Sequence, residues 1–146
     1  WVLSTLIDST AKGGNFMISV GPDQWGNFHP EVIKRLNYVG DWLKVNDEAI
    51  YATRPYKEYK EGEVYYTCTK DKKYVYAISM KWPGEKLKLK SVRAKKDAKI
   101  SMLGDRRRLD WHQDEDGLVI EIPRRFQNEE NRPCQQAYAF KIPLPI

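Results

Sequence analysis

The hydrophobic pattern of the chain changes its period near residue 50. Before that point apolar residues recur at helical spacing, as Leu3, Leu6 and Ile7 do, and after it they occupy alternate positions, as Tyr76 and Ile78 do. A period near 3.6 indicates helices with one packed face, whereas a period of two indicates strands with one buried face. We therefore predict two regions of different fold class, residues 1–50 and residues 51–146.

The first region is predicted to form a helix, a strand, a loop and a second helix. A helix over residues 2–12 ends at a Gly-Gly pair, and an apolar run, Asn15–Val20, follows it. Such a short run without strong alternation is typical of a strand that is covered on both faces in a parallel sheet. A second helix over residues 30–44 begins with a proline, which the first helical turn tolerates. Its apolar stripe consists of Val32, Ile33, Leu36, Val39, Gly40 and Leu43.

This order of elements is a piece of α/β architecture with a parallel sheet. Alone it could not close a core, because a buried strand needs a neighbour on each edge. The chain also begins at Trp1 rather than at a methionine. We therefore expect the first region to be the end of a larger domain that continues upstream.

The second region is predicted to be an antiparallel β-sandwich of about 95 residues. Short segments with alternating apolar positions follow one another at intervals of about 8–12 residues, with turn-forming residues between them. One such turn, Asp114-Glu115-Asp116-Gly117, ends in the Asp-Gly pair that hairpins favour. The predicted strands lie near Val64–Thr69, Tyr76–Trp82, Lys86–Lys90, Lys99–Leu103, Leu109–Trp111, Leu118–Ile122 and Tyr138–Ile142.

The net charge is +5, and a basic stretch between Lys86 and Arg108 carries much of the excess. Nucleic-acid binding needs such charge on one face, together with aromatic side chains for stacking. Here Lys86 and Lys88 alternate with Leu87 and Leu89, which favours a strand with one solvated face. No apolar run approaches the roughly 20 residues of a membrane-spanning helix. We therefore expect neither a nucleic-acid nor a membrane partner.

The two cysteines, Cys68 and Cys134, lie far apart and belong to no Cys-x-x-Cys or Cys/His cluster. We therefore expect no metal site, and no other cofactor. The spacing favours free thiols, with a disulfide between the two as the alternative.

Two motifs in the first region carry a resemblance to a known family. Residues 12–22 read Lys-Gly-Gly-Asn-Phe-Met-Ile-Ser-Val-Gly-Pro, and residues 39–51 read Val-Gly-Asp-Trp-Leu-Lys-Val-Asn-Asp-Glu-Ala-Ile-Tyr. Both closely resemble signatures of the family 29 α-L-fucosidases, in the same order and with a β-rich segment behind them. Ser19 and Asp47 depart from the family pattern, which usually has Asn and Gly at these positions. The glycine of the pattern leads us to predict a left-handed backbone at Asp47, which Asp tolerates better than most residues.

The resemblance implies a retaining exo-glycosidase that removes terminal α-linked L-fucose from glycans. Members use an Asp nucleophile and a separate acid/base carboxylate on a (β/α)8-like barrel, and retaining chemistry sets the two about 5–5.5 Å apart. In the family the motifs that carry these two carboxylates lie upstream of the part that this chain resembles, so we predict no catalytic residue in this chain and no activity of the chain alone. Residues 1–50 would be the last strand and helices of the barrel, and residues 51–146 its C-terminal sandwich. The family implies a lysosomal, secreted or periplasmic parent, and a homo-oligomer stays open.

One residue is a candidate for the rim of the substrate site. Trp25 lies in the predicted loop Asp23–Phe28, and loops that follow barrel strands lie at the face where barrel enzymes build their active sites. Its indole would stack on the sugar beyond the fucose. The alternative, which we favour, is that Trp25 packs against a neighbouring loop or the sandwich.

Other residues that suggest chemistry have structural explanations. We predict that His29 caps a helix, that His112 faces solvent, and that Trp42 and Trp82 lie in the core. Asp114 and its neighbours lack the spacing of a calcium loop and form a turn instead.

The alternative function for the sandwich is a carbohydrate-binding module without hydrolase activity. It would need aromatic side chains gathered on one outer sheet face, and Tyr65, Tyr74 and Trp111 are the only plausible set. A third function is structural, in which the sandwich braces the barrel or builds an oligomer.

Overall fold

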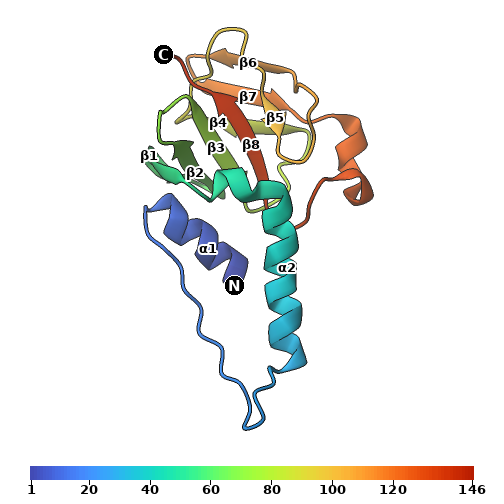
Figure 1. Ribbon diagram of the computed structural model, residues 1–146. Coiled ribbons are helices and arrows are strands. Elements are labelled where there is room, and N and C mark those ends of the chain that lie inside the picture. Colours follow the sequence, from blue (N-terminus) through green and yellow to red (C-terminus); the bar gives the residue numbers. More distant parts are fainter.

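The computed structural model describes residues 1–146, with two helices on one side of two stacked sheets (Figure 1). The helices are α1 (Val2–Ala11) and α2 (Pro30–Asn46), and the 3-10 turns are η1 (Asp47–Ala49), η2 (Arg124–Gln127) and η3 (Glu129–Asn131). The strands are β1 (Thr53–Glu61), β2 (Val64–Thr69), β3 (Tyr74–Ser79), β4 (Lys86–Leu89), β5 (Ser101–Met102), β6 (Trp111–Asp114), β7 (Gly117–Glu121) and β8 (Tyr138–Pro143). Neither helix combines the length and the apolar character needed to span a bilayer.

The strands form the predicted antiparallel sandwich, although β1 was not predicted, because its side chains are mostly exposed and do not alternate. The larger sheet has the order β1-β2-β3-β8-β5 and the smaller one β4-β7-β6, and every neighbouring pair is antiparallel. Along β4 the lysines are exposed and the leucines are buried, so the basic stretch begins as a strand with one solvated face. The hairpin between β6 and β7 turns at Asp114–Gly117, as predicted.

The main core lies between the two sheets. A cluster of 19 buried residues fills this space, with Tyr66, Phe126 and Phe140 among its largest fully buried side chains. Alternate residues of each strand point into it, because successive side chains of a strand lie on opposite faces. Val75 and Ala77 of β3 belong to this cluster, whereas Tyr76 and Ile78 face the other way.

The outer face of the larger sheet is covered by the helices. Leu3 and Ile7 of α1 and Trp42 of α2 form a second buried cluster with the outward residues of β3 and β8. The Trp42 indole Nε1 donates a hydrogen bond to the Ala137 carbonyl at 2.9 Å. The helical region is thus anchored on the sandwich by one end of α2 and by α1, and the predicted core position of Trp42 is confirmed.

The strand predicted at Asn15–Val20 does not form. The segment is extended, but residues 15–22 take part in no backbone hydrogen bond, and Met17 is 88% exposed. In Figure 1 the segment between α1 and α2 runs away from both sheets to a tip and returns to α2. No strand lies beside it to complete a ladder, which explains why an apolar run with the composition of a buried strand stays unpaired here.

Three further expectations, on Asp47, on the apolar stripe of α2 and on the cysteines, have different outcomes. Asp47 adopts right-handed backbone angles, φ −56° and ψ −39°, so the predicted left-handed conformation is wrong. The chain continues from α2 directly into η1, and the reversal comes later, at Ala52 with φ 58°. The apolar stripe of α2 is only partly buried, with Ile33 48% exposed. Cys68 and Cys134 are free thiols, as the spacing favours.

Candidate functional site

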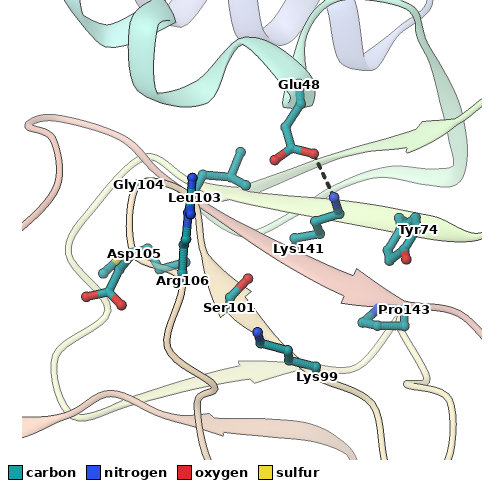
Figure 2. Close-up of a pocket in the computed structure, with 11 residues that line it drawn as sticks. Glu48, Tyr74, Lys99, Ser101, Leu103, Gly104, Asp105, Arg106, Lys141 and Pro143 are labelled. Atoms are coloured by element: carbon teal, nitrogen blue, oxygen red, sulfur yellow. Dashed lines mark hydrogen bonds and ion pairs between the residues drawn. The ribbon is translucent and has the colours of Figure 1, made fainter.

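A hollow of about 630 Å³ lies on the outer face of the larger sheet, where η1 meets the edge strand β5 (Figure 2). Its walls come from η1, β3, β5, β8 and the residues on either side of β5. The lining residues are Glu48, Tyr74, Lys99, Ser101, Met102, Leu103, Gly104, Asp105, Arg106, Lys141 and Pro143.

Strand register brings the polar lining residues together. Lys141 of β8 lies opposite Tyr76 on one neighbouring strand and opposite Ser101 on the other. Directly opposed residues project from the same face of a sheet, and residues two positions along share that face. Tyr76, Lys141 and Ser101 therefore form a polar row across three strands, on the face opposite the main core. Tyr74 and Lys99 lie on the same face, two positions from Tyr76 and from Ser101.

Glu48 of η1 contacts this polar row from the side of the helices. Its Oε2 atom accepts a hydrogen bond from the Lys141 ammonium at 2.8 Å, drawn in Figure 2, and one from the Tyr76 hydroxyl at 3.0 Å. The Lys141 ammonium also lies 4.6 Å from the centre of the Tyr74 ring. Burial, together with the hydrogen bond to the Glu48 carboxylate, raises the pKa of Tyr76 well above its ordinary value, so its hydroxyl stays a donor. These contacts connect η1 to the sandwich.

Asp105 forms the second carboxylate of the hollow, and its surroundings keep it ionised. The Arg107 guanidinium donates to it at 2.7 Å and Arg125 lies 3.5 Å away. The hydrogen bond from Arg107 is the main reason that the pKa of Asp105 falls to about 2. A general acid of glycoside cleavage needs the opposite shift, towards a raised pKa. Asp105 is therefore unsuited to that task.

Gly104 allows the loop that carries Asp105 to pack against the end of α2. Its φ is +89°, and an added Cβ would lie 2.5 Å from Pro133 Cβ and 2.7 Å from Val45 Cγ1. Both the backbone angle and the close approach require glycine.

The structure places Trp25 far from this hollow, in a loop between the extended segment and α2. The Asp23 carboxylate accepts hydrogen bonds from the backbone N–H groups of Trp25 and Asn27, both at 2.9 Å, and these bonds lower the pKa of Asp23. Gly26 adopts φ +84° in the same turn. The loop is therefore held by its own bonds, and the Trp25 side chain is 76% exposed. Its contact with a sugar stays a prediction, and so does the alternative that it packs against another part of the protein.

The other residues that suggest chemistry have the structural roles predicted for them. His29 caps α2, because its Nδ1 atom accepts from the Glu31 N–H at 3.2 Å. His112 is exposed on β6. Trp82 is partly buried against the main core, where the Arg132 guanidinium stacks on it at 3.8 Å. No three His, Cys, Asp or Glu side chains gather in a group that could hold a metal ion.

The three aromatic residues considered for a sugar-binding platform do not share one. Tyr65 and Tyr74 lie on the outer face of the larger sheet, whereas Trp111 belongs to the smaller sheet and packs against the main core. The Trp111 indole is also used in a hydrogen bond to the Ala98 carbonyl. The sequence pattern had no signal for this division, because it depends on which sheet each strand joins.

The hollow itself was missed by sequence reasoning. Its members are spread from Glu48 to Pro143, and only the pairing of β5 with β8 brings them together. A usable signal was the position of Glu48 in the second motif, next to the change from helices to strands. An ionisable residue at such a junction is placed to contact both regions.

Two family models match the chain. One described as the α-L-fucosidase C-terminal domain matches residues 57–143, and one described as α-L-fucosidase matches residues 1–48. The two matches fall on either side of the change in periodicity.

Curated relatives align over most of the chain. Plasma α-L-fucosidase of Rattus norvegicus is 31% identical over 147 residues, which cover 97% of this chain and 32% of the relative. Tissue α-L-fucosidase of Homo sapiens is 38% identical over 127 residues, which cover 84% of this chain and 27% of the relative. The chain therefore spans about a third of the length of the relatives it matches.

Solved structures share the fold. Thermotoga maritima α-fucosidase in complex with a mechanism-based inhibitor superposes with a TM-score of 0.80 at 22% identity, over 96% of this chain and 33% of that one. α-L-Fucosidase isoenzyme 1 from Paenibacillus thiaminolyticus gives 0.82 at 21% identity, over 99% and 34%. With a C-terminal-domain model on more than half of its length and relatives above 30% identity along nearly all of it, the chain belongs to the α-L-fucosidase family.

Proposed function

We propose that this chain is the C-terminal part of a retaining, exo-acting α-L-fucosidase that hydrolyses terminal α-L-fucose from glycans. In this proposal residues 1–50 complete the catalytic barrel, and residues 51–146 form a sandwich that braces it. The names of the aligned relatives support the activity, and the matched family models divide near the same place.

The observation that carries the proposal is the unpaired segment between α1 and α2. Residues 15–22 are extended and apolar, yet they form no backbone hydrogen bond in this chain. Backbone groups of an apolar segment are costly to leave unpaired once they are buried. A barrel whose neighbouring strands come from upstream sequence would supply both edges of pairing, with α1 and α2 as the flanking helices.

Exposed apolar side chains on the same region support this arrangement. Trp1, Met17, Ile33 and Leu36 are each more than a third exposed. Ile33 and Leu36 lie three positions apart on one face of α2, and an exposed apolar face of this kind favours burial against another protein surface. The upstream part of the barrel is the occupant that the family assigns to it.

Catalysis is proposed to depend on upstream residues alone. The two carboxylates of the hollow are held in ion pairs, Glu48 with Lys141 and Asp105 with Arg107. Neither is free to attack a sugar or to protonate a leaving group. The chain by itself is therefore proposed to be inactive.

Hydrogen exchange and fucose release together test the proposal. We expect amides of residues 15–20 to exchange rapidly in the 146-residue chain and to be protected in the longer parent protein, and we expect only the parent to release fucose from a 4-nitrophenyl α-L-fucoside. Amides of β3 serve as the control, because β3 is paired with β2 and β8 within this chain. Turnover by the 146-residue chain, or rapid exchange at residues 15–20 in an active parent, would contradict the proposal.

Trp25 is proposed to contact the sugar beyond the fucose in the parent. The 76% exposure of its side chain and the rigid turn around Asp23 leave the indole face accessible. Trp25→Ala in the parent is expected to raise KM for an extended fucosylated glycan and to leave KM for the small aryl fucoside unchanged. Equal effects on both substrates would exclude a contact beyond the fucose.

A further inference from the structure

The carboxylates of the hollow on the larger sheet are both neutralised within the chain. Glu48 contacts the Lys141 ammonium at 2.8 Å, and Asp105 contacts Arg107 at 2.7 Å and Arg125 at 3.5 Å. Together these five side chains already carry one positive charge more than they carry negative charges. Neither carboxylate therefore dominates the field inside the hollow.

Two further cations line the hollow without any carboxylate partner. Lys99 and Arg106 are both exposed, and neither takes part in an ion pair or a side-chain hydrogen bond. The half-buried hydroxyl of Ser101 also has no hydrogen-bond partner in the chain. In Figure 2 Lys99 and Ser101 lie next to each other, and Arg106 lies on the loop after β5, beside Leu103. The hollow thus offers an ammonium, a guanidinium and a hydroxyl, all of them donors.

The surrounding domain strengthens this local field. Residues 51–146 carry 21 Lys and Arg side chains against 14 Asp and Glu, whereas residues 1–50 carry 4 against 6. A concave site on a positively charged domain concentrates anions from solution. Guanidinium and ammonium groups together match the geometry of a tetrahedral oxyanion, since Arg binds two oxygens at once and Lys acts as a point charge.

The apolar part of the lining indicates what carries the anion. Tyr74 and Pro143, which lie opposite each other on β3 and β8, line the hollow on the outer face of the larger sheet. A ring and a proline beside hydrogen-bond donors offer the flat apolar surface that the C–H face of a sugar contacts. A free inorganic anion would gain nothing from this surface.

We propose that the hollow binds a saccharide through a sulfate or phosphate group on it, held by Lys99, Arg106 and Ser101 with the sugar ring against Tyr74. The saccharide as carrier rests on the proposed function, in which the parent acts on glycans. The hollow is then a second glycan contact, outside the barrel, that recognises substituted chains.

Titration of the folded 146-residue chain, followed by amide NMR, tests the site directly. The probes are N-acetylglucosamine 6-sulfate, N-acetylglucosamine, sodium sulfate and sodium phosphate, at one ionic strength. We expect the sulfated sugar to shift the amides of residues 99–106 and 141, and to bind more tightly than the neutral sugar and both inorganic anions. Equal binding of inorganic sulfate or phosphate would overturn the saccharide carrier, and no shift with any anion would overturn the site.

Charge variants separate this site from general attraction to a basic domain. Arg106→Gln and Lys99→Gln are each expected to weaken binding of the sulfated sugar about three- to fivefold, in line with partly exposed charge contacts. Lys88→Gln is the matched control, because Lys88 is exposed and lies on β4 of the other sheet. The same weakening in all three variants would overturn the proposal. Because binding is measured without hydrolysis, loss of the site and loss of fucosidase activity are separate results.

Discussion

Residues 51–146 and residues 1–50 differ in how far they bury their apolar side chains. The sandwich encloses a cluster of 19 buried residues between its own sheets. Only seven of the 35 buried residues lie in the first 50, yet seven of the ten exposed large hydrophobic side chains do. The sandwich is therefore stabilised by its own contacts, whereas the helical region uses the sandwich for one face and leaves another face uncovered.

The largest expected effect comes from removing a side chain of the sandwich core. Phe140 on β8 is fully buried and lies between the partner residues Ala77 and Met102. Phe140→Ala should lower the free energy of unfolding by about 3–5 kcal/mol, because it leaves a cavity and removes buried apolar area. Urea denaturation followed by tryptophan fluorescence measures the change.

Ile33→Ala on α2 is the matched test in the other region. Its side chain is 48% exposed, so the expected cost in this chain is below about 0.5 kcal/mol. A loss similar to that of Phe140→Ala would break the comparison, since it would mean that the exposed stripe is already packed.

The next largest effect on stability comes from a hydrogen bond between the two regions. The buried Thr67 hydroxyl of β2 donates to the Ala49 carbonyl of η1 at 2.7 Å. Thr67→Val keeps the shape but leaves a buried carbonyl unpaired, and should cost about 1–3 kcal/mol. Thr67→Ser keeps the donor and should recover most of this energy. If Val and Ser behave alike, the bond contributes little to holding the helices on the sheet.

Local pattern predicted the sandwich well because its alternation records burial directly. Lys86 to Leu89 alternate in sequence and in exposure, and the Asp-Gly turn closes the hairpin that it predicts. The strand predicted at Asn15–Val20 failed for a different reason. Its composition fits burial among neighbouring strands, and in this structure no strand pairs with it.

Long-range geometry was beyond sequence reasoning. The sequence placed Trp25 in a loop, which is correct, but it gave no sign that Glu48 and Lys141 meet at 2.8 Å. That contact depends on strand order and on how η1 lies across the sheet. Asp47 shows the same limit at short range, because the family's glycine indicated a left-handed residue and the reversal occurs at Ala52 instead.

A smaller effect on stability depends on pH and comes from Asp105, whose ion-pair partners all lie in the sandwich. The hydrogen bond from Arg107 holds the pKa of Asp105 at about 2 in the folded protein, below its ordinary value of 3.8. The ionised form is therefore favoured by folding, and this stabilisation is complete above about pH 5 and is lost as the pH falls through the folded-state pKa near 2. Because Arg107 is exposed, we expect about 1 kcal/mol or less.

The contribution of ionised Asp105 is measured by comparing unfolding free energies at pH 6 and pH 2. The wild-type protein should be more stable than Asp105→Asn at pH 6, and the difference should vanish near pH 2. A difference that stays constant across this range would assign the effect to packing rather than to charge.

The smallest effect should be confined to the free end of α2. His29 caps this helix through the Glu31 N–H, and Asp is a stronger cap than His because its carboxylate also interacts favourably with the helix dipole. His29→Asp should slow amide exchange at Val32 and Ile33, by an amount that corresponds to about 0.5–1 kcal/mol. The global unfolding free energy should stay unchanged, because this end of α2 makes few buried contacts and can fray without opening the sandwich. A global gain of the same size as the local one would show that the two regions unfold as one unit, and would remove the distinction drawn between them.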